Sequence, residues 1–385
     1  MKLGIDASNL RAGGGVTHLV ELLRIADPLK HGFDQVVVWG GEKILKQVEE
    51  RPWLVKNHQI LLDKALPFRV FWQRFTLTRL ARAFCCDVLF VPGGLYTGDF
   101  CPFVTMSRNF LPFNWRELRR YGLSWMLLRC VLLRYKQSRT FRRSDGLIFL
   151  TRYAKDAVMR VIKTTKGKTT IIPHGVNGRF RRPSREQLSV TEYKKNRSFR
   201  ILYVSIIDVY KHQWYVAEAV AQLRRCGLPV VLNLVGPAYP PALKRLQKTV
   251  ARIDPDGEYI RYVGEIPHAE LHKQYAQSNL CLFASSCENM PNILLEIMAS
   301  SLPIACSNHK PMPELLGDAG VYFDPENPAE IASAIRTMIE SPELCAKMAQ
   351  MSFERAQEYS WALCSDRTFE FLAEVACTFQ KDRVI

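Results

Sequence analysis

The sequence predicts an α/β fold made of two Rossmann-like domains, and three observations lead to it. The chain has 385 residues, which is more than one typical domain holds. Short apolar runs, the pattern of parallel strands buried on both faces, alternate with helical stretches. The alternation stops in a polar stretch after residue 182 and then begins again, so we expect two consecutive doubly wound units.

In the first half, we expect a glycine loop at Gly13–Gly15 that leads into a helix over residues 17–25. The expected strands lie at residues 1–7, 35–39, 87–92, 103–106, 146–150 and 169–176. In the second half, strands are expected at 200–207, 230–235, 259–263, 280–284, 302–306 and 321–323. Helices are expected there at 214–225, 292–300, 328–339, 342–358 and 361–379.

These elements place one domain at residues 1–182 and a second at 200–360. Residues 183–199 are polar and contain a basic run, so we assign them to the interdomain linker. Residues 361–385 are expected to form a helix that crosses back towards the first domain. Ligands of such sheets bind at the carboxyl ends of the strands, so a shared ligand would lie in a cleft that the two domains face.

Composition limits the class of protein. Eleven scattered cysteines without a C-x-x-C pair indicate reduced core thiols of a cytoplasmic protein and no metal site. The N-terminus has the pattern of a strand, which excludes a signal peptide at that position, and no apolar run is long enough for a membrane span. The net charge of +16 needs a partner or another explanation, and nucleic acid, anionic lipid and phosphorylated substrates are the candidate partners.

Two glutamates flank the start of an expected helix. Glu288 lies in the loop after the strand at 280–284, and Glu296 lies in the second turn of the helix that begins near Asn292. Free backbone N–H groups at a helix start bind diphosphates, and carboxylates accept hydrogen bonds from vicinal hydroxyls. On spacing alone, such glutamates are more often dipole partners of a helix or solvated surface residues.

The surrounding segment, residues 262–324, resembles the signature of retaining GT-B glycosyltransferases of the family 4 type, also called glycosyl transferases group 1. It shows Gly264-Glu265-Ile266, Ala284-Ser285, the E-x7-E pair Glu288 and Glu296, Pro303-Ile304 and Asp324-Pro325 in order. The Glu-Asn-Met-Pro-Asn form is similar to enzymes of bacterial surface-polysaccharide assembly. Weaker similarity covers the rest of the chain, including Pro173-His174-Gly175-Val176.

The resemblance implies roles for single residues. Lys211 would contact the donor phosphates and Glu288 the transferred sugar, as the catalytic pair, and Glu296 would bind the ribose. Gly15 in the glycine loop, Ile266 near the base, and His174 would contribute to the donor site. The helix start would supply Met290, Pro291, Asn292 and Ile293. The family requires no metal or other cofactor, and the leaving phosphate is expected to take the acceptor proton.

Two positions depart from the family pattern. The family has Gly-Arg before the phosphate-binding lysine, whereas this chain has Ser205-Ile206-Ile207. After the strand at 103–106, a histidine is usual, and this chain has Ser107-Arg108-Asn109. We therefore take Arg108 and Asn109 as acceptor-side candidates. The glycine loop also lacks the third glycine of a dinucleotide fingerprint, because position 18 is His18.

Positive charge concentrates in segments 68–84 and 115–143, where arginines alternate with aromatic and aliphatic residues. Both segments have the pattern of basic amphipathic helices that lie on anionic membranes. An ordinary amphipathic helix packed on the domain would show the same pattern. No nucleic-acid-reading module accompanies the charge, so nucleic acid is excluded as a partner.

The resemblance thus implies a glycosyltransferase that moves a hexose from a GDP-mannose-like or UDP-hexose donor to a growing, lipid-linked surface polysaccharide or O-antigen. We expect the protein to lie in the cytoplasm and to bind the cytoplasmic face of the inner membrane peripherally through the basic segments. Two alternatives stay open: a GT-B-fold sugar-nucleotide epimerase, and a non-catalytic membrane-associated member of the fold.

Overall fold

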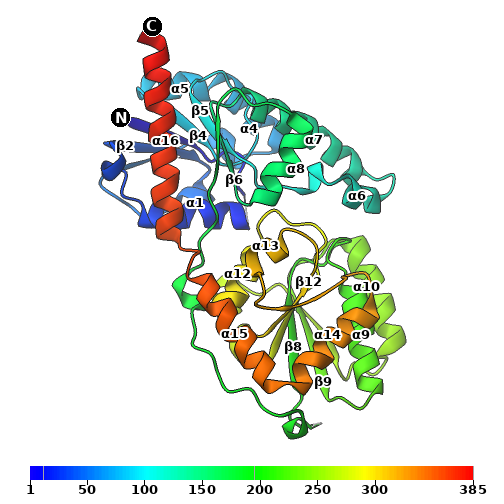
Figure 1. Cartoon of the computed structure of the whole chain (residues 1–385). Helices are drawn as coiled ribbons and strands as arrows, with labels where there is room; N and C mark the ends of the chain where they lie inside the picture. Colours follow the sequence, from blue (N-terminus) through cyan, green and yellow to red (C-terminus); the bar gives the residue numbers. More distant parts are fainter. Residues whose placement is uncertain (12, 195, 385) are drawn as a thin grey trace. The chain divides into compact units, whose positions relative to one another are not determined.

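The computed structural model describes residues 1–11, 13–194 and 196–384. It divides into two compact units, shown in Figure 1. The first contains residues 1–115 and 123–175 together with the chain from Ser360 onward, and the second contains residues 116–122 and 176–359. None of the helices in the described residues is long and apolar enough to cross a membrane.

The first unit is built on a parallel sheet of seven strands in the order β3-β2-β1-β4-β5-β6-β7. Its strands are β1 (Lys2–Asp6), β2 (Gln35–Gly40), β3 (Leu54–His58), β4 (Val88–Val91), β5 (Phe103–Met106), β6 (Gly146–Phe149) and β7 (Lys168–Ile171). β1 is central: Leu3 pairs with Val36 on one side and with Val88 on the other. These apolar residues are fully buried, as expected for a sheet covered on both faces.

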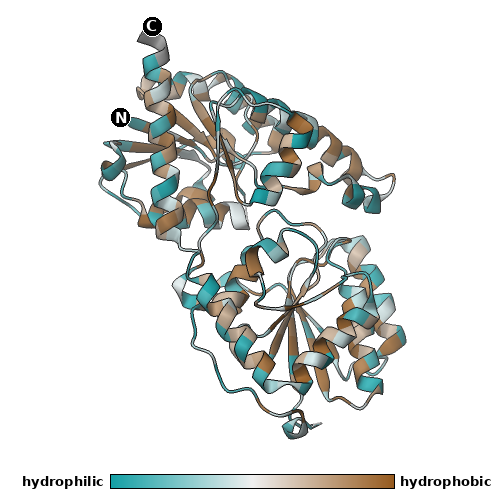
Figure 2. Ribbon diagram, viewed as in Figure 1, coloured by the Kyte–Doolittle hydropathy of each residue, from teal (hydrophilic) through white to brown (hydrophobic). Residues whose placement is uncertain are grey.

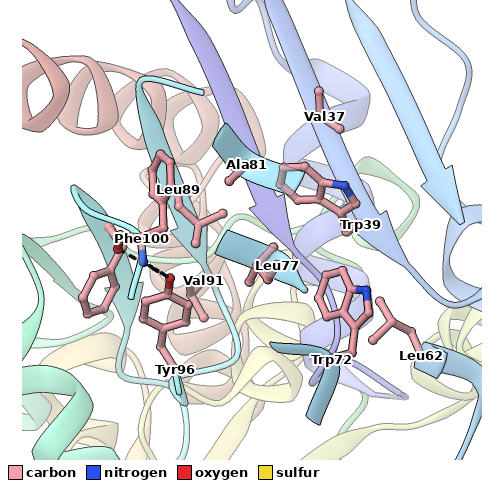
Figure 3. Close-up of a cluster of buried hydrophobic side chains, with 11 residues drawn as sticks. Val37, Trp39, Leu62, Trp72, Leu77, Ala81, Leu89, Val91, Tyr96 and Phe100 are labelled. Atoms are coloured by element: carbon pink, nitrogen blue, oxygen red, sulfur yellow. Dashed lines mark hydrogen bonds between the residues drawn. The ribbon is translucent and has the colours of Figure 1, made fainter. Parts of the chain in front are cut away.

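Helices cover both faces of this sheet. They are α1 (Gly14–Ile25), α2 (Glu42–Leu45), α3 (Ile60–Asp63), α4 (Leu66–Phe75), α5 (Leu77–Ala83), α7 (Trp125–Arg143), α8 (Arg152–Ile162) and the C-terminal α16 (Trp361–Val384). α16 contacts α1, β4 and β6, so the end of the chain is part of the first unit. Figure 3 shows a core cluster between α4, α5 and the strands, in which the Trp39 and Trp72 rings are buried.

The second unit has a six-stranded parallel sheet in the order β10-β9-β8-β11-β12-β13. The strands are β8 (Phe199–Val204), β9 (Val230–Val235), β10 (Ile260–Gly264), β11 (Leu280–Phe283), β12 (Ile304–Ser307) and β13 (Val321–Phe323). The helices are α9 (Gln213–Arg225), α10 (Pro240–Ile253), α11 (Leu271–Gln277), α12 (Asn292–Ala299), α13 (Met312–Leu316), α14 (Pro328–Glu340) and α15 (Pro342–Ala356). Brown ribbon along the strands marks the apolar centre of each sheet in Figure 2.

The prediction of two Rossmann-like units is confirmed, and every predicted strand is present. β3 was not predicted, because Lys56, Asn57 and His58 are polar and β3 is the edge strand of its sheet. α1 begins at Gly14, three residues earlier than expected.

The polar stretch 183–199, assigned to the linker, lies within the second unit, and the chain passes between the units at Gly175–Val176. Polar composition was misleading here because these residues pack on the second unit. The Arg185 guanidinium donates to the Ala276 carbonyl oxygen at 2.6 Å, and the Tyr193 ring contacts Phe199 edge-on. Lys195, in the same stretch, lies outside the described residues.

The basic segments are not the two continuous helices that the sequence predicts. Residues 68–84 form α4 and α5, which meet at Thr76. Residues 115–143 form α6 (Trp115–Leu118), a 3-10 turn and α7, with a break at Gly122, whose φ of 58° favours glycine. Residues 116–122 moreover belong to the second unit, so segment 115–143 does not lie wholly in the first domain as expected.

Candidate functional site

The strand order of the second sheet reverses between β8 and β11, which are adjacent although they are not consecutive in the chain. Crevices at such a switch point, beyond the carboxyl ends of the strands, are where open α/β sheets bind ligands. Lys211 follows β8 and Glu288 follows β11, so the topology brings these two predicted residues to the same point.

Lys211 and Glu288 form an ion pair there. The Lys211 ammonium group also lies 5.2 Å from the centre of the Tyr210 ring and 5.3 Å from that of Phe283. Lys211 is buried, and the Tyr203 hydroxyl donates to its backbone carbonyl oxygen at 2.8 Å. The Lys211 ammonium group is thus fixed at the carboxyl ends of the strands. To bind an anion there, it must either contact the anion and Glu288 together or give up its ion pair with Glu288.

His212 fixes the loop between β11 and α12 to the loop after β8. Its backbone is left-handed, with φ 55°, and its Nε2 lies 2.8 Å from the Ser286 hydroxyl oxygen. The Ser286 N–H also donates to the Tyr210 carbonyl oxygen at 2.9 Å. Burial, with a smaller effect from the charge of Arg120, lowers the pKa of His212 to about 3. His212 is therefore a neutral, structural hydrogen-bonding group that keeps Lys211 and Glu288 in register.

The start of α12 is formed by the predicted residues Met290, Pro291, Asn292 and Ile293. Pro291 precedes the first turn of the helix, and no side chain caps that turn or places a carboxylate in it. Met290 and Pro291 are buried, whereas Asn292 and Ile293 are partly exposed. The uncapped backbone N–H groups of this turn are suited to bind a diphosphate.

Glu296 lies one turn into α12 and is almost fully buried. Its Oε1 lies 2.7 Å from Nε2 of His268, and its Oε2 accepts a hydrogen bond from the Tyr275 hydroxyl at 3.1 Å. Burial, reinforced by the negative charge of Glu296, raises the pKa of Tyr275 well above its usual value. The phenol therefore stays protonated and donates a hydrogen bond to Glu296. Each carboxylate oxygen keeps a lone pair for a further donor such as a hydroxyl group.

Ile266 lies two residues beyond β10 in a loop, half-buried, and precedes His268. The turn before it is Gly264, whose φ of 84° favours glycine. The same short loop therefore presents an apolar side chain and the imidazole that holds Glu296.

In the first unit, the glycine loop and the end of β5 come together. The Arg108 guanidinium donates to the Gly14 carbonyl oxygen at 2.5 Å and to that of Gly15 at 3.3 Å. Burial lowers the pKa of Arg108 to about 10, which leaves it charged at neutral pH. Asn109 is exposed. Arg108 thus fixes the glycine loop through two hydrogen bonds, whereas Asn109 faces solvent.

His174 is buried in the same unit, with its ring centre 4.9 Å from that of His18 and 5.8 Å from that of Trp361. The ligand atoms of His18, His174 and Cys364 lie within 4.8 Å of one another, a spacing that could hold a metal ion. Burial, followed by the positive charge of Arg108, lowers the pKa of both histidines. The same guanidinium would repel a cation, so we assign no metal to this cluster.

The sequence did not point to His268, Tyr275 or His18. His268 and Tyr275 lie on other elements than Glu296, and His18 lies on another element than His174. Only the fold brings these pairs together. The arginine expected before Lys211 is not replaced by Arg120, although Arg120 belongs to the same unit. Its guanidinium donates to Glu117 at 2.6 Å and to Glu326 at 2.5 Å, and both partners neutralise it.

Among protein families, residues 198–341 match the family described as glycosyl transferases group 1. That region contains Lys211, Glu288, Glu296 and His268. Among curated proteins, the O-antigen chain mannosyltransferase B of Escherichia coli is 29% identical over 110 residues, which cover 29% of each chain. The chain spans less than two thirds of the length of the curated relatives it matches first.

Several solved structures match almost the whole chain, and two of them are informative here. WaaG, a glycosyltransferase involved in lipopolysaccharide biosynthesis, superposes with a TM-score of 0.69 at 14% identity, covering 97% of this chain and 99% of WaaG. The HepE protein of Anabaena in complex with UDP-glucose gives a TM-score of 0.66 at 17% identity, covering 99% and 100%. These similarities show a common fold.

Proposed function

We propose that this chain, which has the GT-B fold and whose residues 198–341 belong to the glycosyl transferases group 1 family, is a retaining glycosyltransferase. It would move a hexose from a nucleoside-diphosphate sugar to a saccharide acceptor. One observation carries the proposal: the Lys211–Glu288 pair and the uncapped start of α12 meet at the switch point of the second sheet.

The donor diphosphate would accept hydrogen bonds from the first-turn N–H groups of α12, and the Lys211 ammonium group would neutralise part of its negative charge. Cleavage of the glycosidic bond leaves a further negative charge on this diphosphate, so groups that neutralise it lower the barrier. Glu288, released from Lys211 by the incoming phosphate, would then accept hydrogen bonds from hydroxyls of the transferred sugar. The proposed reaction uses no metal, as the resemblance to the family implies, and Lys211 and the start of α12 would supply the positive charge.

Glu296 would bind the ribose diol with the lone pairs that His268 and Tyr275 leave open. Ile266, in the same loop as His268, would contact the base. The donor nucleotide is either GDP, with a mannose-like sugar, or UDP, with a hexose. Binding of UDP-glucose by a protein of the same fold supports the general class of donor.

The acceptor is proposed to be a growing, lipid-linked surface polysaccharide or O-antigen. The mannosyltransferase and WaaG, both named for surface-saccharide assembly, support this class. In the first unit, Gly15 and Arg108 form one cluster and Asn109 faces solvent, which makes Asn109 the better acceptor contact of the two candidates.

Exposed apolar residues on α4 and α7 support a peripheral position on an anionic membrane. The N-terminal half of α7 turns Trp125, Leu128, Leu132 and Tyr135 to solvent, among arginines such as Arg129. A monomeric protein rarely exposes so many large apolar side chains in one helix. We propose that these helices bind the cytoplasmic face of the inner membrane, where cations on the protein meet anionic lipid.

A nucleotide-release assay with a panel of GDP- and UDP-sugars, and membranes as the acceptor source, tests the function. We expect release with one donor class only, and only when acceptor is present. Glu296→Ala and Lys211→Ala should each weaken donor binding. Wild-type donor affinity in both variants would refute the site, and turnover without acceptor would instead indicate an epimerase.

A further inference from the structure

The second unit contains a cavity that the donor site does not use. It has a volume of about 450 Å³ and lies against one face of β8, β9 and β10, with the end of α11 beside it. Three of its lining residues, Arg200, Val231 and Arg261, are each the second residue of their strand. The cavity therefore lies at the amino-terminal part of the sheet, whereas Lys211 and Glu288 follow the carboxyl ends of their strands.

The face of the sheet that lines this cavity is polar. Along β9, alternate residues are apolar and buried on one face, whereas Asn233 points to the other face and lines the cavity. The strand register places Arg261 beside Asn233 and Arg200 beside Val231. Parallel sheets are normally covered on both faces and apolar throughout, so packing of the sheet does not account for these polar residues. Such a departure from the rules of the fold is typical of a functional site.

The charged groups of the cavity are mostly cationic. Three arginines and one glutamate line it, which leaves two positive charges uncompensated. Arg224 reaches Glu258 at 3.5 Å. Among the described residues, Arg200 and Arg261 have no carboxylate within ion-pair distance. A phosphate monoester carries about two negative charges at neutral pH, and guanidinium groups bind it through paired hydrogen bonds, so its charge matches that of the cavity.

Amide groups next to these arginines have unused hydrogen-bonding capacity. Asn233 and Gln274 are partly buried and line the cavity, and neither side chain has a hydrogen-bond partner in the part of the chain that the structure describes. A side-chain amide offers two N–H donors and one carbonyl oxygen, a set that suits the hydroxyl groups of a sugar. Inorganic phosphate alone would leave these amides unused.

From this arrangement we propose that the cavity binds a sugar phosphate, with the phosphate on Arg200 and Arg261 and the sugar hydroxyls on Asn233 and Gln274. A phosphodiester within a polysaccharide carries a single negative charge, so the charge of the cavity favours a free monoester. The site is separate from the donor site and goes beyond the proposed function. A ligand at this end of the strands lies away from Lys211, so it acts as an effector and not as a substrate.

Calorimetric titration of the full chain with the 1- and 6-phosphates of glucose and mannose, with glucose, and with inorganic phosphate tests the proposal. We expect at least one hexose phosphate to bind about tenfold more tightly than glucose or inorganic phosphate, because it alone engages the arginines and the amides together. If inorganic phosphate binds equally well, the cavity is a site for simple anions and the sugar part is wrong. If none of the hexose phosphates binds, the whole proposal fails.

Substitutions in the cavity locate the binding. Arg261→Gln and Arg200→Gln should each weaken the hexose phosphate about tenfold. Asn233→Leu, which keeps the size of the side chain, should weaken the hexose phosphate and leave inorganic phosphate unchanged. Arg252→Gln is the matched control, because Arg252 is an exposed arginine of the same unit that pairs with Glu218 and does not line the cavity.

Lys211→Ala separates this site from the donor site. Binding of the hexose phosphate should persist in this variant, and binding of UDP or GDP should be unchanged in Arg261→Gln. If Lys211→Ala removes the hexose phosphate and Arg261→Gln does not, the ligand occupies the donor site and the proposal is refuted. The affinity of Lys211→Ala for nucleotide, measured separately, reports on the proposed function alone.

Discussion

Nε2 of His268 lies 2.7 Å from Oε1 of Glu296, across the gap between the loop after β10 and the second turn of α12. His268 is partly exposed, whereas Glu296 is buried. The contact therefore fixes a carboxylate inside the unit by means of a side chain that solvent can reach. His268 acts on a bound nucleotide through Glu296, which makes it a positioning residue.

His268→Ala should raise the KM for the donor by about five- to tenfold and leave kcat nearly unchanged, because a misplaced Glu296 binds the ribose less well. His268→Gln, which can still donate a hydrogen bond, should restore much of the loss. His272→Ala is the control, because His272 is a partly buried histidine in the same segment whose Nδ1 hydrogen-bonds the Ala269 carbonyl oxygen and not Glu296. An equal loss in the alanine and glutamine variants would contradict a positioning role.

Glu288→Gln should separate binding from transfer. The substitution releases Lys211 from its ion pair, so affinity for a nucleoside diphosphate should stay constant or increase. Transfer should fall by about a hundredfold or more, as when an electrostatic contact to the reacting group is removed. Titration with UDP and GDP, alongside turnover, measures both. Nucleotide binding that is weakened as much as turnover would show that Glu288 serves the nucleotide alone.

The stability of the first unit should decrease as the pH falls below about 6.5. Burial keeps His18 and His174 neutral in the folded state, whereas both take up protons in the unfolded chain near that pH. The unfolded state then binds more protons, so the free energy of unfolding falls by up to about 1.4 kcal/mol per pH unit for each histidine. Above about pH 7, this contribution is constant.

Urea unfolding at pH 7.5 and 5.5 measures the effect. His18→Phe, which keeps an aromatic ring beside His174 and Trp361, should reduce the pH dependence by roughly one proton. His272→Gln should leave the dependence unchanged. A pH profile of His18→Phe that matches the wild type would mean that His18 is protonated in the folded state.

Removal of apolar groups from α7 should reduce membrane binding without loss of stability. Trp125 and Leu128 are exposed, so Trp125→Ser with Leu128→Ser should change the free energy of unfolding by about 0.5 kcal/mol or less. Co-sedimentation with vesicles of anionic lipid should fall several-fold, and added salt should weaken the wild-type binding further. Unchanged co-sedimentation would assign the surface to another partner.

The strands and the region around Glu288 were predictable because their signals are local. Buried parallel strands appear as runs such as Val36–Val38, and the E-x7-E spacing spans a single loop and helix. The break at Gly122 was missed because the arginine-rich residues on both sides continue a helical pattern. A single glycine within such a pattern does not by itself predict the positive φ that Gly122 adopts.

The partners of the candidate residues were not predictable for a different reason. Lys211 and Glu288 are 77 residues apart, and their contact follows only from the pairing of β8 with β11. The same is true of His268 with Glu296. Sequence reasoning assigned Lys211 and Glu288 separate roles towards the donor, whereas in the structure the two side chains form an ion pair with each other.

The assignment of residues 116–122 to the second unit and of the final helix to the first has a practical result. The backbone passes between the units after residues 115, 122, 175 and 359. A protease cut at residue 175 would therefore leave each fragment with a piece embedded in the other fragment's unit. We expect such a nicked protein to elute from gel filtration as a single species and to come apart only in denaturant. For the same reason, neither unit can be expressed complete as one continuous segment of the sequence.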